Sequence, residues 1–325
     1  PSSDKRPESI MQLVDTYDSL PRPLAGAVVV LGNFDGVHLG HAGVIQAARQ
    51  MADEMTTKVV VLTFEPHPRS VFAPHLPPFR LTPKAAKARF LAELGVAGCV
   101  AQKFDSEFSE HSAEDFVRNV LIRGLQVRHL VVGADFRFGK GREGDVAYLQ
   151  SNADRFGFMT SCVEPVLDPN GVAYSSTRVR EALTEGDVET AASILGRPFQ
   201  IEGMVVQGEQ RGRTIGFPTA NILLGEYIRP KLGVYAVRAE MPDGKMVSGV
   251  ANIGKRPTVN GLDERLEVHL FDFSSDIYGK NLNIHLQRFI RPEQKFANFE
   301  ELKIQIVRDA ETARHALQEE ASARL

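Results

Sequence analysis

Apolar runs alternate with helical stretches through the first half of the chain, and this order restricts the fold more than any other feature. The runs VVVLG, KVVVLTF and HLVVG are almost continuously apolar rather than alternating. Strands of this kind are buried on both faces, as in a parallel sheet covered by helices. The first half is therefore predicted to be an α/β domain with a doubly wound parallel sheet, its strands at 27–32, 58–64, 98–103, 127–133 and 158–164.

The pattern changes near residue 199, where short strands follow one another with turn residues between them. Six such strands predict a small antiparallel β-barrel, and a capping residue at Asn298 with Glu301 three positions later predicts a terminal helix over 299–320. A chain of 325 residues is long enough for two domains, which we place at 1–187 and 188–325. The predicted barrel strands are 200–206, 217–223, 234–240, 245–253, 265–273 and 281–289.

His38-Leu39-Gly40-His41 follows the first apolar run, where a helix is expected to begin. A helix N-terminus exposes unpaired N–H groups and a partial positive charge, so it can bind an anion, and glycines such as Gly32 allow close approach to a ligand. The two imidazoles can donate hydrogen bonds to phosphate oxygens. These features favour an enzyme acting on a nucleotide triphosphate. A zinc site or an ordinary pair of loop histidines are the alternatives.

A second helix start, SSTRVR, offers hydroxyls from Ser175, Ser176 and Thr177 together with the guanidinium of Arg180. Hydroxyls and arginines at a helix N-terminus suit triphosphate oxygens. A plain helix cap with solvated arginines explains the same residues equally well, so these side chains are candidates for a second phosphate site.

Two predicted strands end in the aromatic stretches TFEPHP and GADFRFG. Phe64 in the first, with Asp135, Phe136 and Phe138 in the second, can enclose a flat ring at the ligand-facing edge of the sheet. For each phenylalanine taken alone, packing in the core beneath the loop is the better explanation.

The second half contains the stretch GEQRGRTIGFPTAN, whose glycines, among them Gly216, can close over phosphates. Thr219 and Asn221 are two positions apart, so on a strand they face the same side, and their oxygens are suitable ligands for Mg²⁺. A hairpin with an exposed threonine and asparagine is the alternative. Glu267 lies on the polar face of an alternating strand, where a solvent-facing glutamate is the common explanation.

The motifs GNFDGVHLGH, TFEPHP, VVGADFRFG and SSTRVR, in this order, resemble the adenylyltransferase half of the bacterial bifunctional riboflavin kinase/FMN adenylyltransferases. GFPTAN resembles the kinase half, so that the resemblance extends from about residue 28 to residue 299. It implies phosphorylation of riboflavin to FMN by Mg-ATP, followed by adenylylation of FMN by ATP to FAD with release of pyrophosphate. Glu65 stands where an aspartate is common in related sequences.

The resemblance also implies roles for individual residues. ATP and adenylyl transfer are expected at Gly32, Asn33, His38 and His41, and the triphosphate at Ser175, Ser176, Thr177 and Arg180. In the kinase half, ATP is expected at Gly216, Thr219 and Asn221, with Mg²⁺ on Thr219 and Asn221. Glu267 is expected to take the proton from the ribityl 5′-hydroxyl, since a primary hydroxyl needs a positioned base. The flavin is expected at Phe64, Asp135, Phe136, Phe138 and Arg256.

Composition adds few further constraints. Charged residues make up 24% and hydrophobic residues 43% of the chain, as in soluble globular proteins. A net charge of −3 gives no general attraction to nucleic acid or to an anionic membrane. Neither a signal peptide nor a membrane span is apparent, and Cys99 and Cys162 lack a CxxC spacing, so we expect reduced core cysteines. The expected protein is a cytoplasmic enzyme whose partners are riboflavin, FMN and ATP; the oligomeric state stays open.

Two other functions fit parts of this pattern. A kinase with a decayed adenylyltransferase half would lose the paired histidines, and a flavin-binding regulator would lose the Mg²⁺ and base positions. Both motif sets are intact in this chain, which favours the bifunctional enzyme.

Overall fold

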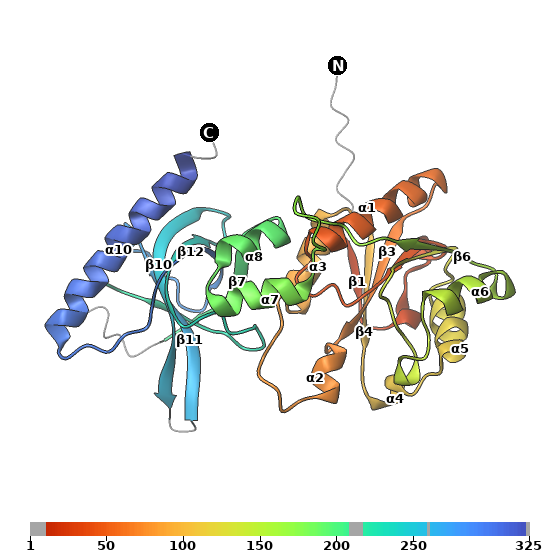
Figure 1. Ribbon diagram of the computed structural model, residues 1–325, viewed down its shortest axis with the longest axis horizontal. Helices are drawn as coiled ribbons and strands as arrows, with labels where there is room; N and C mark the ends of the chain where they lie inside the picture. Colours follow the sequence, from red (N-terminus) through yellow and green to blue (C-terminus); the bar gives the residue numbers. More distant parts are fainter. Residues whose placement is uncertain (1–10, 208–216, 259–260, 323–325) are drawn as a thin grey trace, which may run out of the picture. The chain divides into compact units, whose positions relative to one another are not determined.

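The computed structural model describes residues 11–207, 217–258 and 261–322, and the chain divides into two compact units (Figure 1). The first comprises Pro1–Pro77 and Thr82–Tyr174, and the second Pro78–Leu81 and Ser175–Leu325. Helices α7 (Ser176–Glu185) and α8 (Val188–Leu195) group with the second unit, in which the backbone N–H of Lys231 donates to the carbonyl of Leu183 at 2.9 Å. The domain boundary expected after residue 187 stays a prediction.

A six-stranded parallel sheet, in the order β1-β4-β3-β2-β5-β6, forms the centre of the first unit. The sixth strand, β1, was not predicted because three residues beside a polar segment carry too little pattern; it pairs in parallel with β4. The doubly wound parallel sheet itself is confirmed. Its strands are β1 (Gln12–Val14), β2 (Val28–Leu31), β3 (Val59–Glu65), β4 (Gly98–Lys103), β5 (His129–Gly133) and β6 (Met159–Val163).

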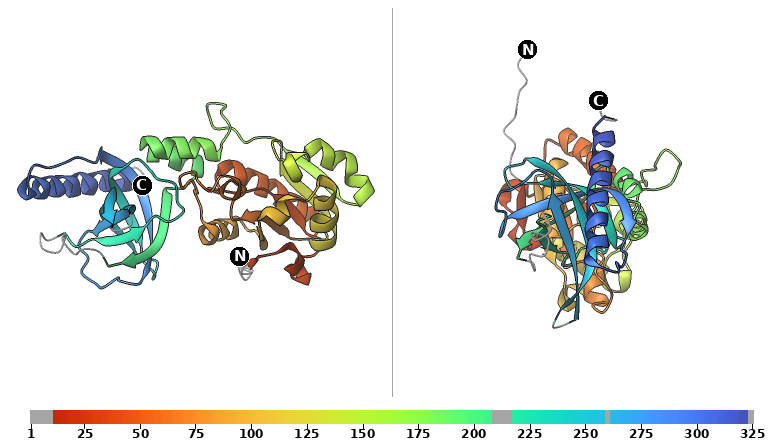
Figure 2. Two further views of the ribbon diagram at one scale, coloured as in Figure 1. Left: turned by 90° about the horizontal axis from the view of Figure 1, so that it is seen from below. Right: turned by 90° about the vertical axis from the view of Figure 1, so that its left-hand side faces the viewer.

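Helices cover both faces of this sheet (Figure 2). Val28 and Val30 face the core under α1 (Leu39–Glu54) and α3 (Lys84–Glu93). Val29 and Leu31 face the opposite core, under the π-helix η3 (Phe116–Gly124) and α6 (Val146–Phe156). Every residue of β2 is therefore buried, which explains why its sequence is continuously apolar. Short elements complete the unit: η1 (Tyr17–Ser19), η2 (Arg22–Leu24), α2 (Pro68–Phe72), α4 (Ser106–Ser109), α5 (Ala113–Asp115) and η4 (Lys140–Arg142).

The strand order reverses at β2, since β3 and β4 lie on one side of it and β5 and β6 on the other. In doubly wound sheets, ligands bind outside the carboxyl ends of the strands at such a reversal. The histidine motif follows β2 and the stretch GADFRFG follows β5, so both leave the sheet at this point. The topology thus places the histidine motif at the position where doubly wound sheets bind their ligands.

The second unit is a closed antiparallel barrel in the order β10-β11-β8-β7-β12-β9, as predicted. Its strands are β7 (Phe199–Val206), β8 (Ala220–Leu223), β9 (Gly233–Glu240), β10 (Met246–Thr258), β11 (Gly261–Leu270) and β12 (Asn281–Pro292). The hairpin of β10 and β11 is longer than expected, because its pairing continues as far as Thr258 and Gly261. The whole stretch NIGKRPT is therefore part of β10.

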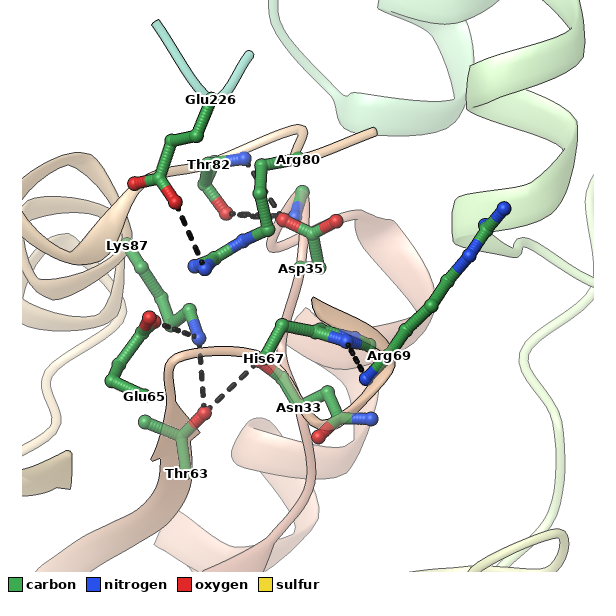
Figure 3. Close-up of polar contacts among 11 residues, drawn as sticks. Asn33, Asp35, Thr63, Glu65, His67, Arg69, Arg80, Thr82, Lys87 and Glu226 are labelled. Atoms are coloured by element: carbon green, nitrogen blue, oxygen red, sulfur yellow. Dashed lines mark hydrogen bonds and ion pairs between the residues drawn. The ribbon is translucent and has the colours of Figure 1, made fainter. Parts of the chain in front are cut away.

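A short connecting segment of the first half also belongs to the second unit. Arg80 pairs in parallel with Tyr227, and its guanidinium Nη1 lies 3.4 Å from Oε2 of Glu226 (Figure 3). The segment Pro78–Leu81 thus belongs to the barrel unit although it is far from Ser175–Leu325 in the sequence.

Helix α10 (Phe299–Ser322) packs along β9, β10 and β12 (Figure 1). Its predicted cap is confirmed, since Oδ1 of Asn298 accepts from the backbone N–H of Glu301 at 2.9 Å. Phe299, at the start of the helix, is 52% exposed. The packed stripe lies further along the helix, at Ala310, Ala313, Ala316 and Leu317. No helix within the described residues is long and apolar enough to cross a membrane.

Candidate active sites

His38 and His41 cap the N-terminus of α1 reciprocally. Nδ1 of His38 accepts from the backbone N–H of His41, and Nδ1 of His41 accepts from that of His38, both at 3.3 Å. The rings stack with centroids 3.7 Å apart. A ring nitrogen that accepts a hydrogen bond cannot carry the proton of a neutral imidazole, so this hydrogen-bond pattern assigns the hydrogen to Nε2 in each ring. The cap therefore turns both histidines into Nε2–H donors.

The glycine between the histidines lies in close contact with other groups of the protein. A Cβ at Gly40 would lie 3.0 Å from Cε1 and Nδ1 of His38 and 3.2 Å from the carbonyl oxygen of Tyr174. A Cβ at Gly32 would likewise lie 3.0 Å from the ring of Phe34. We had expected these glycines to make room for a ligand. In the structure they make room for neighbouring protein groups.

The loop between β2 and α1 has an unusual backbone. Phe34 and Val37 have φ values of 49° and 42°, and Gly36 has 93°. Positive φ costs a non-glycine residue roughly 1–3 kcal/mol and persists only where the surroundings hold it. Phe34 and Val37 are 2% and 3% exposed, so the core holds them in place, whereas the side chain of Asn33 is exposed.

Buried polar groups hold the same loop from the side of α3 (Figure 3). Oδ1 of Asp35 accepts from the backbone N–H of Thr82 at 2.9 Å, and the Thr82 hydroxyl accepts from the N–H of Gly36 at 2.8 Å. Thr82 stands before Pro83 in a pattern typical of a helix start, but Pro83 occupies the cap position of α3 and the Thr82 side chain binds the loop instead. A local pattern resembled a cap because the real partner lies more than forty residues away.

A buried lysine on α3 was missed by the sequence analysis. The ammonium of Lys87 lies 2.7 Å from Oε1 of Glu65 and donates to Oγ1 of Thr63 at 3.1 Å (Figure 3). The Thr63 hydroxyl in turn donates to the carbonyl of Asn33 at 3.0 Å. One signal was present: Lys87 precedes Phe90 by three positions in KAAKARFLAEL, which places it on the apolar side of its helix.

The stretch SSTRVR begins α7, as predicted. Ser175 is the N-cap residue, and its hydroxyl accepts from the backbone N–H of Arg178 at 3.3 Å. Nε of Arg180 donates to the carbonyl of Phe79 at 3.0 Å. Ser176, Thr177 and Arg180 belong to the second compact unit, whereas the histidines belong to the first. A role of these residues in holding the triphosphate stays a prediction.

The candidate flavin residues differ in burial. Phe64 and Phe138 are 8% and 6% exposed and pack in a cluster of aromatic rings, which favours the core explanation for these two. Phe136 is half-buried with its ring 5.8 Å from that of Phe138, and Asp135 is exposed. Arg256 lies on β10, but its side chain is outside the described residues.

In the barrel, strand pairing aligns the candidate kinase residues. Glu267 on β11 lies directly opposite Asn221 on β8 and, on its other side, opposite Asn252 on β10. Directly opposite residues share a face with Cβ atoms about 4.5–5.5 Å apart, so these three side chains form one polar row. The pairing of Asn252 with Glu267 was not predicted, because the register between two strands cannot be read from either strand alone.

Asn221 is 7% exposed, and its amide nitrogen donates to the carbonyl of Thr219 at 3.5 Å. Thr219 directly precedes β8, and Gly216 lies outside the described residues. Over the described ranges, no three histidine, cysteine, aspartate or glutamate side chains gather as a metal cluster.

These features define a class of protein. One unit is a doubly wound domain with a histidine-capped helix at its strand-order reversal, and the other is a closed barrel with a row of amide and carboxylate side chains. Together they describe a two-domain enzyme of the nucleotide-dependent transferase class.

The chain belongs to the family of bifunctional riboflavin kinase/FMN adenylyltransferases. The FAD synthetase family model matches residues 20–178 and the riboflavin kinase family model residues 195–317. The bifunctional riboflavin kinase/FMN adenylyltransferase of Haemophilus influenzae is 44% identical over 94% of this chain and 98% of that protein. The Escherichia coli enzyme of the same name is 45% identical over 94% and 97%. The predicted family, enzyme class and FAD-forming function are confirmed.

A solved structure supports the fold. The crystal structure described as a macrolide-efflux protein from Streptococcus pneumoniae is 33% identical, with a TM-score of 0.82 over 94% of this chain and 99% of that one. The agreement over both chains confirms the predicted fold class.

Proposed function

We propose that this chain makes FAD in two steps, with the kinase reaction in the barrel unit and adenylyl transfer at the end of α1. In the first step the terminal phosphoryl group of ATP passes to the ribityl hydroxyl of riboflavin, which gives FMN and ADP. In the second step the phosphate of FMN attacks the α-phosphorus of another ATP, which gives FAD and releases pyrophosphate. The observation that supports this best is the reciprocal histidine cap, which supplies two Nε2–H donors at a helix N-terminus.

For adenylyl transfer, the roles follow from the charges of the reactants. The FMN phosphate is already an anion, so it needs alignment and charge stabilisation rather than a base. His38 and His41 would donate from Nε2 to the α-phosphate oxygens as negative charge builds there. The exposed side chain of Asn33 would bind ATP beside them. The start of α7, with Ser175, Ser176, Thr177 and Arg180, would hold the remaining phosphates.

For phosphorylation of riboflavin, the polar row of the barrel supplies the groups required. Glu267 would accept the proton of the ribityl hydroxyl, since an unactivated alcohol is a poor nucleophile. Thr219 and Asn221 would hold Mg²⁺, because both side chains offer hard oxygens. The ion would neutralise phosphate charge. The cross-strand pairing of Asn221 with Glu267 supports a single site.

The flavin would be recognised by Asp135 and Phe136, the accessible candidates in the stretch GADFRFG. Phe64 and Phe138 would pack behind them. Arg256 remains a candidate contact in the kinase half. Two free cysteines fit the reducing cytoplasm, which we propose as the compartment.

The experiment that tests this proposal separates the two activities on one chain. Glu267→Gln and Thr219→Ala should lose FMN formation from riboflavin, by about 10²–10⁴-fold for Glu267→Gln, and keep FAD formation from supplied FMN. His38→Ala should do the reverse. Glu202→Gln, on β7 of the same barrel, is the matched control and should keep both activities. Loss of both activities from either single-site variant, in a folded protein, would refute independent sites.

A further inference from the structure

The Thr63 hydroxyl is fixed in direction by its two partners. A lysine ammonium can only donate, so Thr63 Oγ1 must accept from Lys87, at 3.1 Å. The single hydroxyl hydrogen is then left to donate to the carbonyl of Asn33, at 3.0 Å. Thr63 is 0% exposed, so water does not compete for either bond. The order of donors and acceptors therefore runs in one direction, from Lys87 through Thr63 to Asn33.

The position of Lys87 is unusual for a lysine. Its side chain is 2% exposed, and its charge is balanced by Glu65, whose side chain is 12% exposed. Burying two charges removes them from water, and apolar side chains of similar volume often stabilise a core as well or better. Packing of α3 on the sheet therefore gives no reason for an ion pair at this place. A requirement for a fixed hydrogen-bond donor to Thr63 explains the buried ion pair.

The hydrogen bonds from Lys87 through Thr63 end at Asn33, in the loop before the histidine cap. Asn33 exposes its side chain while its carbonyl is held by Thr63, and Asp35 and Gly36 are held by Thr82. Lys87 lies on α3, and Thr82 lies just before this helix. The loop before His38 is thus held at two points by one segment, while its backbone keeps costly positive φ values.

We propose that Lys87 is a positioning residue for adenylyl transfer, which acts by directing the Thr63 hydroxyl to the Asn33 carbonyl and so fixes the loop that presents Asn33 to ATP. This role rests on the proposed function of the first unit. In this role Lys87, whose side chain is 2% exposed, acts through Thr63 and Asn33 rather than on the substrate. Its effect should fall on ATP in the adenylyl-transfer reaction and leave the kinase reaction unchanged.

The test begins with Thr63. Thr63→Val keeps the branched shape and removes the hydroxyl, and should lower kcat/KM for ATP in adenylyl transfer about tenfold, the size of one lost hydrogen bond. KM for FMN should stay within about twofold, and Thr63→Ser should restore the rate. Thr160→Val on β6 is the matched control, because Thr160 Oγ1 is buried without a hydrogen-bond partner within the described residues. It should keep the parental kcat/KM.

A second variant tests Lys87 without leaving a buried charge. Lys87→Met combined with Glu65→Gln neutralises the pair at similar volume, and should show the same loss as Thr63→Val because the hydroxyl can then turn. FMN formation on the same chain reports that each variant is folded. Parental activity of Thr63→Val or of the double variant, or failure of Thr63→Ser to restore the rate, would overturn the proposal. His38→Ala distinguishes the two hypotheses: if it keeps FAD formation, the proposed function fails, and if only it loses activity, the role of Lys87 fails.

Discussion

The two tasks of His38, capping a helix and donating to phosphate, can be separated by one pair of substitutions. In His38→Asn the amide oxygen can replace Nδ1 as the cap acceptor, since asparagine is among the best N-cap residues, but no group replaces the Nε2–H donor. In His38→Ala both are lost. The cap bonds are 3.3 Å long, beyond the usual 2.9–3.0 Å, so the stability contribution should lie in the lower half of the usual range of about 0.5–2 kcal/mol.

The expected results differ between stability and catalysis. His38→Asn should unfold at the parental temperature, whereas His38→Ala should lose about 1–4 °C, as expected for that energy in a unit of this size. Both should lower FAD formation from supplied FMN by about 10²–10³-fold, the effect of one lost donor to a developing oxyanion. Thermal unfolding and a flavin separation assay measure the two quantities, and His75→Asn, at an exposed histidine, is the control. If His38→Asn kept FAD formation within a fewfold, the histidine would be a helix cap and not a catalytic donor.

Two further predictions concern the rest of the molecule. Arg291 on β12 forms a fork of two bonds, 2.9 and 2.7 Å, with Asp309 of α10, which is 5% exposed. Arg291→Ala would leave the Asp309 carboxylate buried without its arginine partner, at a cost of about 3 kcal/mol of stability. The midpoint temperature for thermal loss of FMN formation should therefore fall by about 6–12 °C. An unchanged midpoint would contradict this prediction. Burial raises the pKa of the Cys99 thiol to about 12, and Cys99 is 1% exposed while Cys162 is half-buried. Iodoacetamide at pH 8 should therefore label Cys162 faster than Cys99. Equal labelling rates of the two cysteines, measured by peptide mass spectrometry, would refute this prediction.

Most of the fold could be predicted because burial on both faces leaves a direct mark on composition. All residues of β2 lie in one of two cores, and VVVLG records this without information from elsewhere in the chain. The barrel strands were found from turn residues, but the length of the β10–β11 hairpin was not. Pairing between strands depends on both partners, so Asn252 opposite Glu267 became visible only in the structure.

In the candidate site, too, the sequence predicted some features while others became visible only in the structure. The histidine motif could be recognised in the sequence, yet the reasons for its residues could not. A side chain at Gly40 would crowd the His38 ring and the Tyr174 carbonyl. Thr82, which resembles a helix cap, is a partner of Asp35. Such contacts join residues that are far apart in the chain.

A local motif therefore predicts the chemistry of this site, while distant buried groups set its geometry. The histidines can act as Nε2–H donors only while each Nδ1 stays occupied by the other's backbone N–H. The loop that leads into this cap has positive φ values at Phe34 and Val37. Since such a backbone persists only where its surroundings hold it, the polar contacts from α3 are part of the site even though they touch no substrate. The functional unit of this half is thus the motif together with the segment Thr82 to Lys87, and substitutions in that segment should alter adenylyl transfer before they alter folding.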